Sequence, residues 1–285
     1  MTNGFAKQVH IIPLGHEFDR AVRPFDTNIA SRVYLIVDTG NGTSKGESER
    51  DKSMNKIQKT MYTPRVRKYL EEKGIEVRLV ETETFDLETM LKEFTSIIRH
   101  EQELGNEIFI NMSSSGRLGA VGAFIAGMAY NVPTYYVHSQ SFANDNEREE
   151  HGVSICPSEK ISILPDFKFE RPDSIEARIL ECLYTAKKDS GRQQDGISSM
   201  EIVEHLEKNN VKDFTLRDPD LAGNLAYRRT ENSRRLMRLM IIMKKLVDDD
   251  KYVENHKSGR KMMYSLTELG EHAFCLCGME KDKYA

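Results

Sequence analysis

The stretch FINMSSSGRLGAVGAFIAGMA, residues 109–129, decides the fold expected for this chain. It begins as an apolar, β-prone run, passes through three serines and a glycine, and continues as an apolar helix rich in small residues. A buried strand followed directly by a buried helix is typical of a parallel sheet covered by helices on both faces. The turn between them brings backbone N–H groups and hydroxyls to a helix N-terminus, which suits an anion or a ribose-phosphate.

Strand-like and helix-like segments alternate on both sides of this stretch. The pattern predicts strands at 8–15, 32–40, 76–83, 107–114, 133–142 and 161–167, and intervening helices at 18–29, 52–73, 86–105 and 116–131. This alternation predicts an α/β, Rossmann-like domain. In such sheets ligands bind outside the carboxyl ends of the strands, at a topological switch point. Gly15 and His16 end the first strand and the serine turn ends the fourth, so both are expected at that edge.

Two observations limit what the serine turn implies by itself. A tight strand-to-helix connection capped by serine needs the same residues without any ligand. The turn also matches neither a Walker A loop nor GxGxxG. A second glycine-rich stretch, DTGNGTSKG at 38–46, matches neither motif and is interpreted as a loop that flanks the site.

Composition sets wide bounds on the protein class. The chain has 285 residues and a formal net charge of −4, which argues against a uniformly basic nucleic-acid binder. Its four cysteines include one isolated C-x-C, at Cys275 and Cys277, which indicates reduced thiols near a core and no metal site. The apolar run at 9–14 is too short for a signal-peptide core, and no stretch reaches the length of a membrane span. A cytoplasmic protein is expected.

Composition changes near Pro172, where we place a domain boundary between residues 1–170 and 171–285. Helices are expected at 175–188 and 197–209, the second with Ser198 or Ser199 as N-cap. A further helix is expected after Thr230, its predicted N-cap, with Leu236, Leu239, Met240, Met243 and Leu246 as its apolar face. A strand, the basic tip HKSGRK (256–261), a second strand and a helix start follow. This order resembles a winged helix-turn-helix domain.

Basic residues are concentrated in the part of the sequence that would contact DNA in such a domain. Residues 225–261 contain 11 basic and 5 acidic side chains, counted from the sequence. Arginines on a helix suit the major groove, and basic groups on a wing suit phosphate. The predicted DNA-contacting residues are Arg228, Arg229, Asn232, Arg234, Arg235 and Arg238 on the helix and Lys257, Arg260 and Lys261 on the wing. A solvated charged helix with a hairpin is the alternative.

The phrases VHIIPLGHEFDRAVRPF and FINMSSSGRLGAVGAFIAGMA, combined with a C-terminal winged helix, resemble archaeal regulators of the CRISPR-associated Rossmann-fold (CARF) type. The resemblance covers nearly the whole chain. It implies a homodimer that binds a cyclic oligoadenylate across its two-fold axis and double-stranded DNA through the winged helix, with no further cofactor. By the same resemblance the ligand-binding residues are Gly15, His16, Asp19, Arg20, Ser113, Ser114, Ser115, Gly116 and Arg117.

Three functions remain open from the sequence. The first is a ligand-responsive transcriptional regulator that senses a cyclic oligoadenylate or a related nucleotide. The second is a ring nuclease that cleaves such a ligand, for which His16 is the candidate acid or base. The third is a dimeric DNA-binding protein whose N-terminal domain only dimerises.

Overall fold

The computed structural model describes residues 6–39, 53, 56–157, 160–164, 172–189, 196–259 and 261–278. These residues fall into two compact units, one within residues 1–170 and one within 171–279. Most of the glycine-rich stretch at 38–46 lies outside the described residues, and so does Arg260.

The N-terminal unit is built on a six-stranded sheet with the order β3-β2-β1-β4-β5-β8. The strands are β1 (Gln8–Pro13), β2 (Arg32–Asp38), β3 (Glu76–Thr82), β4 (Glu107–Asn111), β5 (Thr134–Val137) and β8 (Ile161–Ile163). The first five pair in parallel and β8 is antiparallel to β5. β2 is buried along its whole length, as the unbroken apolar run predicts for a strand covered on both faces.

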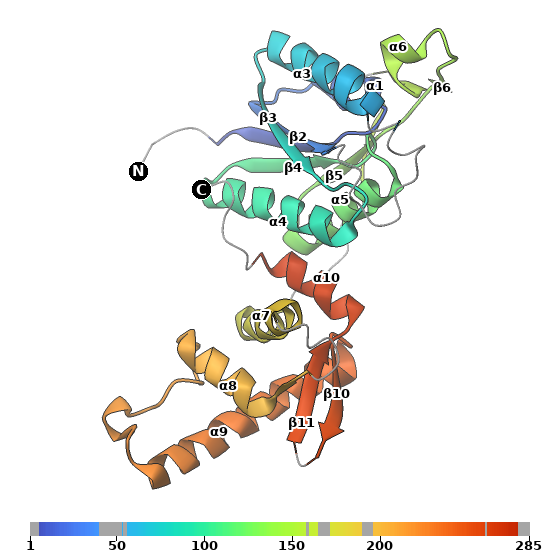
Figure 1. Ribbon diagram of the computed structural model, residues 1–285. Coiled ribbons are helices and arrows are strands. Elements are labelled where there is room, and N and C mark those ends of the chain that lie inside the picture. The colour runs from blue at the N-terminus through green and yellow to red at the C-terminus, as the bar shows by residue number, and fades with distance from the viewer. Residues whose placement is uncertain are drawn as a thin grey trace. The chain divides into compact units, whose positions relative to one another are not determined.

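Helices cover both faces of this sheet (Figure 1). One face carries α1 (Asp19–Val22), the short η1 (Arg23–Asp26) and α3 (Thr63–Glu72), which follows the π-helical turn η2 (Gln58–Tyr62). The other face carries α4 (Leu87–Glu103) and α5 (Arg117–Tyr130). The Asp86 side chain accepts from Thr89 N at 2.8 Å and so caps α4, as the sequence predicts. The three layers confirm the expected Rossmann-like fold.

The strand order creates a switch point between β1 and β4. From β1 the chain adds β2 and β3 on one side, and from β4 it adds β5 on the other. The connections that leave β1 and β4 therefore depart toward opposite faces, and this leaves a crevice at the carboxyl ends of these two strands. A small excursion lies beside it: β6 (Ser141–Phe142), α6 (Arg148–His151) and β7 (Ser154–Ile155). Val153 N donates to His16 O at 3.0 Å and ties the excursion to the loop after β1.

The C-terminal unit is a winged helix domain, as predicted. Its elements are α7 (Ser174–Asp189), β9 (Ile197–Ser198), α8 (Ser199–Lys208), η3 (Pro219–Leu221), α9 (Leu225–Lys244), η4 (Lys245–Asp249), β10 (Val253–Ser258), β11 (Lys261–Leu266) and α10 (Glu268–Cys277). β10, β11 and β9 form one antiparallel sheet, in which β10 and β11 are the wing. Ser198 and Glu201 form a capping box at the start of α8.

The longest helix, α9, begins earlier than the sequence predicts. Its N-cap is Asn224, whose side chain accepts from Ala226 N and Tyr227 N; Thr230 lies inside the helix, so the predicted N-cap is wrong. The Asn224 amide provides the same capping oxygen that Thr230 was expected to provide. The predicted apolar face is also partly wrong, because Leu239, Met243 and Leu246 are buried whereas Met240 is 63% exposed.

Candidate functional site

A pocket of about 140 Å³ lies at the switch point, where the loop after β1 meets the loop between β4 and α5. Five of the nine residues predicted to bind ligand line it: Gly15, His16, Ser115, Gly116 and Arg117. The two predicted motifs are about 100 positions apart in the sequence. Their meeting follows from the central pairing of β1 with β4, in which Ile11 lies opposite Ile110.

Gly15 lets the two loops approach closely. Its N–H donates to Ser114 O at 2.6 Å. A Cβ at this position would lie 3.2 Å from the same oxygen, which is tighter than most Cβ contacts. The glycine therefore fixes the spacing of the two walls of the pocket.

Ser113 and Ser114 are buried behind the pocket, so their hydroxyls do not line it. Ser114 Oγ donates to Pro13 O at 2.9 Å, which ties the serine turn to the end of β1. Ser113 Oγ donates to Asn111 Oδ1 at 2.6 Å and accepts from Val137 N at 3.1 Å. The predicted ligand contacts from these two hydroxyls are corrected: the hydroxyls satisfy buried backbone and amide groups and hold the turn in shape.

Asp19 and Arg20 also act behind the pocket. Asp19 is 1% exposed and accepts from Arg23 Nε at 3.1 Å and from Cys156 N at 3.1 Å, with His151 Nδ1 at 3.0 Å. Arg20 donates to Ser113 O at 3.2 Å from a side chain that is only 13% exposed. Both residues are predicted to touch ligand; in the structure Asp19 holds the segment that contains His151 and Cys156, and Arg20 holds the loop after β4.

Part of the pocket wall was not predicted from the sequence. The further lining residues include Gln58 from η2, Thr84 and Phe85 from the loop after β3, and Met90 from α4. The Gln58 side chain donates to Leu14 O, and Thr84 Oγ1 donates to Asp38 Oδ2 at 2.8 Å. Phe85 is 42% exposed and offers an aromatic face. None of these residues belongs to a recognisable motif; only their position after neighbouring parallel strands could have indicated them.

The pocket combines an apolar part with an anion-binding edge. Leu14, Phe85 and Met90 form an apolar wall. The N-cap residue of α5 is Gly116, which has no side chain to cap the first turn. The first backbone N–H groups of α5 thus remain available to an anion, and exposed Arg117 adds a positive charge beside them. Such a site suits a ligand with an aromatic or apolar part and a phosphate.

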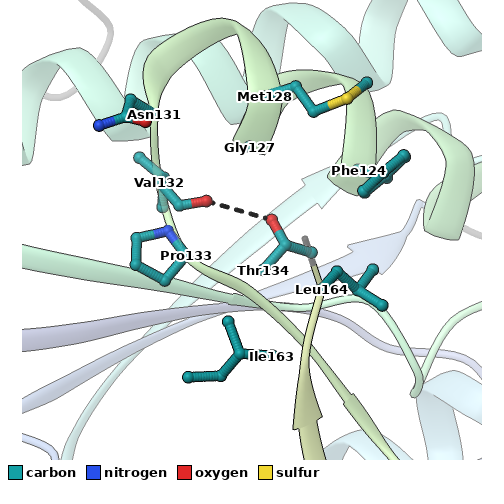
Figure 2. A pocket seen from close by; sticks show the side chains of 9 residues that line it. All are labelled: Phe124, Gly127, Met128, Asn131, Val132, Pro133, Thr134, Ile163 and Leu164. Carbon is teal, nitrogen blue, oxygen red and sulfur yellow. Dashed lines mark hydrogen bonds between the residues drawn. The ribbon is translucent and has the colours of Figure 1, made fainter. Parts of the chain in front are cut away.

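A second cavity, of about 170 Å³, lies at the opposite end of β5 (Figure 2). The end of α5, the start of β5 and the end of β8 line it, and Thr134 Oγ1 donates to Val132 O at 3.3 Å within it. Its nine lining residues carry no charged side chain. It lies away from the carboxyl ends of the parallel strands and offers no positive side chain to a phosphate, so we assign the candidate site to the switch-point pocket.

Some of the predicted DNA-contacting residues are exposed, whereas others are bonded to groups within the domain. Arg228, Arg229 and Arg238 on α9 and Lys257 and Lys261 on the wing are exposed. These positions are available to phosphate or base edges. Asn232 is partly exposed, but its Oδ1 accepts a hydrogen bond from Arg235 Nη2.

Arg234 and Arg235 instead hold the connection between α8 and α9. Arg234 donates to Asp213 O at 2.9 Å and to Thr215 O at 3.1 Å. Arg235 is only 2% exposed; it donates to Phe214 O at 3.0 Å and pairs with Glu207 at 2.8 Å. The prediction that Arg235 contacts DNA is therefore wrong, because its position in α9 lies on the same stripe as buried Leu239 and Met243.

Two further properties concern the part of the chain that the structure describes. No group of three or more His, Cys, Asp or Glu side chains there could hold a metal ion, and none of the four cysteines, all of which lie within it, forms a disulfide. None of the described helices is long and apolar enough to cross a membrane.

Fold and site together define a two-domain protein, in which a Rossmann-like domain with a strand-end pocket precedes a winged helix. Residues 8–142 match the family described as HFX_2341_N-like, N-terminal, and residues 175–278 match the DUF6293 C-terminal winged helix domain. The winged helix domain inferred from the sequence is confirmed by the second match, and the structure itself shows the Rossmann-like fold of the N-terminal domain.

A curated relative is the uncharacterized protein MJ1513 of Methanocaldococcus jannaschii, which is 31% identical over 161 residues. The alignment covers 53% of this chain and 44% of the relative, so the chain spans less than half the length of that protein.

Similar solved structures share 11–12% of their residues with this chain. VC1899 of Vibrio cholerae has a TM-score of 0.40 and covers 91% of this chain and 75% of its own. Csm6 of Enterococcus italicus, bound to cyclic hexa-2'-fluoro-hexa-dAMP, has a TM-score of 0.39 and covers 85% of this chain and 56% of its own. Can2 of Sulfobacillus thermosulfidooxidans, in complex with cyclic tetra-adenylate, has a TM-score of 0.37 and covers 92% of this chain and 77% of its own. At this similarity they support no assignment of a ligand.

Proposed function

We propose that this chain is a homodimeric transcriptional regulator that senses a cyclic oligoadenylate or a related nucleotide through the switch-point pocket and binds DNA through its winged helix. The observation that carries the proposal is the meeting of Gly15 and His16 with Ser115, Gly116 and Arg117 in one pocket. Phosphate suits the start of α5 and Arg117, and a nucleobase suits the apolar wall beside Phe85.

The outer surface of α5 supports the dimer. After Arg117 the helix contains no charged residue, and Val121 on its surface is 48% exposed. A helix that is apolar all round is normally covered, and a second copy related by a two-fold axis covers it with the same surface. Light scattering at micromolar concentration tests this: a dimer is expected for the parent protein and a monomer for Val121→Glu. A monomeric parent would refute the dimer.

Binding and cleavage are separated by one experiment with labelled cyclic tetra-adenylate. The full-length protein is incubated with the ligand, and bound and cleaved fractions are measured by filter binding and gel electrophoresis. The regulator requires intact bound ligand and weaker binding by Arg117→Ala, whereas Arg67→Ala, exposed on α3 outside the pocket, binds as the parent does. Cleavage that is lost in His16→Asn supports the ring nuclease. No bound nucleotide supports a protein whose N-terminal domain only dimerises.

A further inference from the structure

Helix α9 has an inward and an outward stripe with different chemistry. Glu231, Arg235, Leu239 and Met243 follow one another at four-residue spacing and are all buried. Ala226, Thr230, Ser233 and Met237 are spaced by three or four residues on the opposite side of the helix, and all four are exposed. Met237 is 69% exposed, although it is an apolar side chain. The outward stripe is therefore the part of α9 that can enter a groove.

The outward stripe presents methyl groups and no free hydroxyl proton. Thr230 Oγ1 donates to Ala226 O at 3.2 Å, and Ser233 Oγ donates to Arg229 O at 3.0 Å. These bonds use the hydroxyl protons within the helix itself. The Ala226, Thr230 and Met237 methyl groups then form the contact surface. Guanine O6 and N7 need a hydrogen-bond donor, which this stripe lacks, whereas the thymine C5-methyl needs an apolar contact.

Positive charge flanks this stripe, and the acids nearest the start of α9, Asp218 and Asp220, are exposed in the segment before the helix. Arg229 and Arg238 are exposed on either side of it, and Arg228 is exposed near the start of α9. Glu231 is the one acidic residue within α9, which is described along its whole length, and it is buried. The charge of this surface complements DNA phosphate on both edges of a groove. The positively charged surface ends after α9, where Asp248 and Asp249 are exposed in η4.

We propose that α9 recognises T·A-rich DNA by contact of Thr230 and Met237 with thymine methyl groups in the major groove, while the flanking arginines bind phosphate. The proposal rests on the DNA-binding function proposed above and specifies its target. It replaces the expectation that Arg234 and Arg235 contact DNA, since Arg235 lies in the core of the domain and Arg234 is bonded to the loop before α9.

The test begins with selection of bound duplexes from a random pool by the full-length protein. Single thymidines of the selected duplex are then replaced by deoxyuridine, which removes only the C5-methyl group. At a contacted thymidine the affinity is expected to fall about fourfold, the value for one buried methyl group. Met237→Ala is expected to abolish this difference, because its side chain no longer reaches the methyl group. Arg238→Ala is the matched control and is expected to weaken binding to both duplexes equally.

The outcomes distinguish this proposal from the function on which it rests. Selection of G·C-rich sites, or equal affinity for thymidine and deoxyuridine duplexes, overturns the proposal and leaves DNA binding intact. Failure of the parent protein to bind any duplex at low salt overturns DNA binding itself. If Met237→Ala changes the DNA-free protein to a smaller oligomer, a second copy covers the stripe and the proposal is wrong.

Discussion

The buried guanidinium of Arg235 leads to a prediction that separates stability from DNA contact. Arg235→Ala removes the ion pair with Glu207, which is 2.8 Å long, and the donor to Phe214 O, which is 3.0 Å away. It also leaves a cavity beside Phe214, which is fully buried. Because α8, the loop at Phe214 and α9 all converge on this one side chain, the whole connection before α9 loses its anchor.

The expected loss of unfolding free energy in Arg235→Ala follows from the burial of the ion pair. Loss of one partner of a fully buried ion pair costs about 3–5 kcal/mol. The Glu207 side chain is 30% exposed and regains water, so the lower end of that range applies. We expect a loss of about 3 kcal/mol in the free energy of unfolding, which in a domain of this size lowers Tm by on the order of 10–20 °C. Arg238→Ala, an exposed change on the same helix, should alter stability by less than about 0.5 kcal/mol.

Thermal unfolding followed by circular dichroism measures the loss of stability. Fluorescence anisotropy with a promoter fragment and a scrambled duplex measures DNA binding. At a temperature where Arg235→Ala is folded, we expect it to keep the parent's preference between the two duplexes. A variant with unchanged Tm that no longer discriminates between the duplexes would show that Arg235 contacts bases, and the assignment of inward and outward stripes would be refuted.

Three further predictions concern the other parts of the chain. Arg117→Ala should weaken binding of an anionic nucleotide by about 1.5–3 kcal/mol without a change in Tm, because an exposed charged donor is removed; unchanged affinity in calorimetry would remove Arg117 from the site. Lys257→Ala with Lys261→Ala should weaken all duplexes alike and lower the salt slope by about 1 for each phosphate that is no longer neutralised, as measured by anisotropy at several salt concentrations; an unchanged slope would exclude the wing from the interface. Burial lowers the pKa of His10 from 6.5 to about 4, so below pH 6.5 the unfolded state binds more protons and stability should fall by about 3 kcal/mol as pH falls to 4. His10→Leu should flatten this dependence in denaturant titrations, and an identical slope in parent and variant would contradict it.

The sequence predicts the fold well because buried parallel strands leave unbroken apolar runs. It also predicts that Gly15 and the serine turn lie at one edge, since parallel strands end on the same side. It does not show which loop side chains turn inward. Ser114 and Ser115 are adjacent and chemically identical, yet one is buried against Pro13 and the other lines the pocket. That difference depends on the strand order, which places β1 beside the serine turn.

Helix α9 shows a second limit. Arginine is usually exposed, so composition alone assigns Arg235 to the surface. The four-residue spacing from Arg235 to Leu239 and Met243 was the signal that placed it on the buried stripe. The wrong choice of Met240 as a core residue concealed this signal, because both Met240 and Met243 fit an apolar helical face. Phe85 carried no signal of its own, since an isolated aromatic residue after a strand is common in any α/β domain.

The inward stripe of α9 maintains the fold, whereas the outward stripe carries the proposed DNA contacts. Substitutions at Thr230, Ser233 or Met237 leave the core untouched, because these side chains point away from Leu239 and Phe214. Exposed positions of this kind tolerate substitution at little cost in stability. Under the proposed mode of DNA binding, a few changes on the outward stripe would alter the preferred DNA site while the fold stays the same, and randomising these three positions would select such variants.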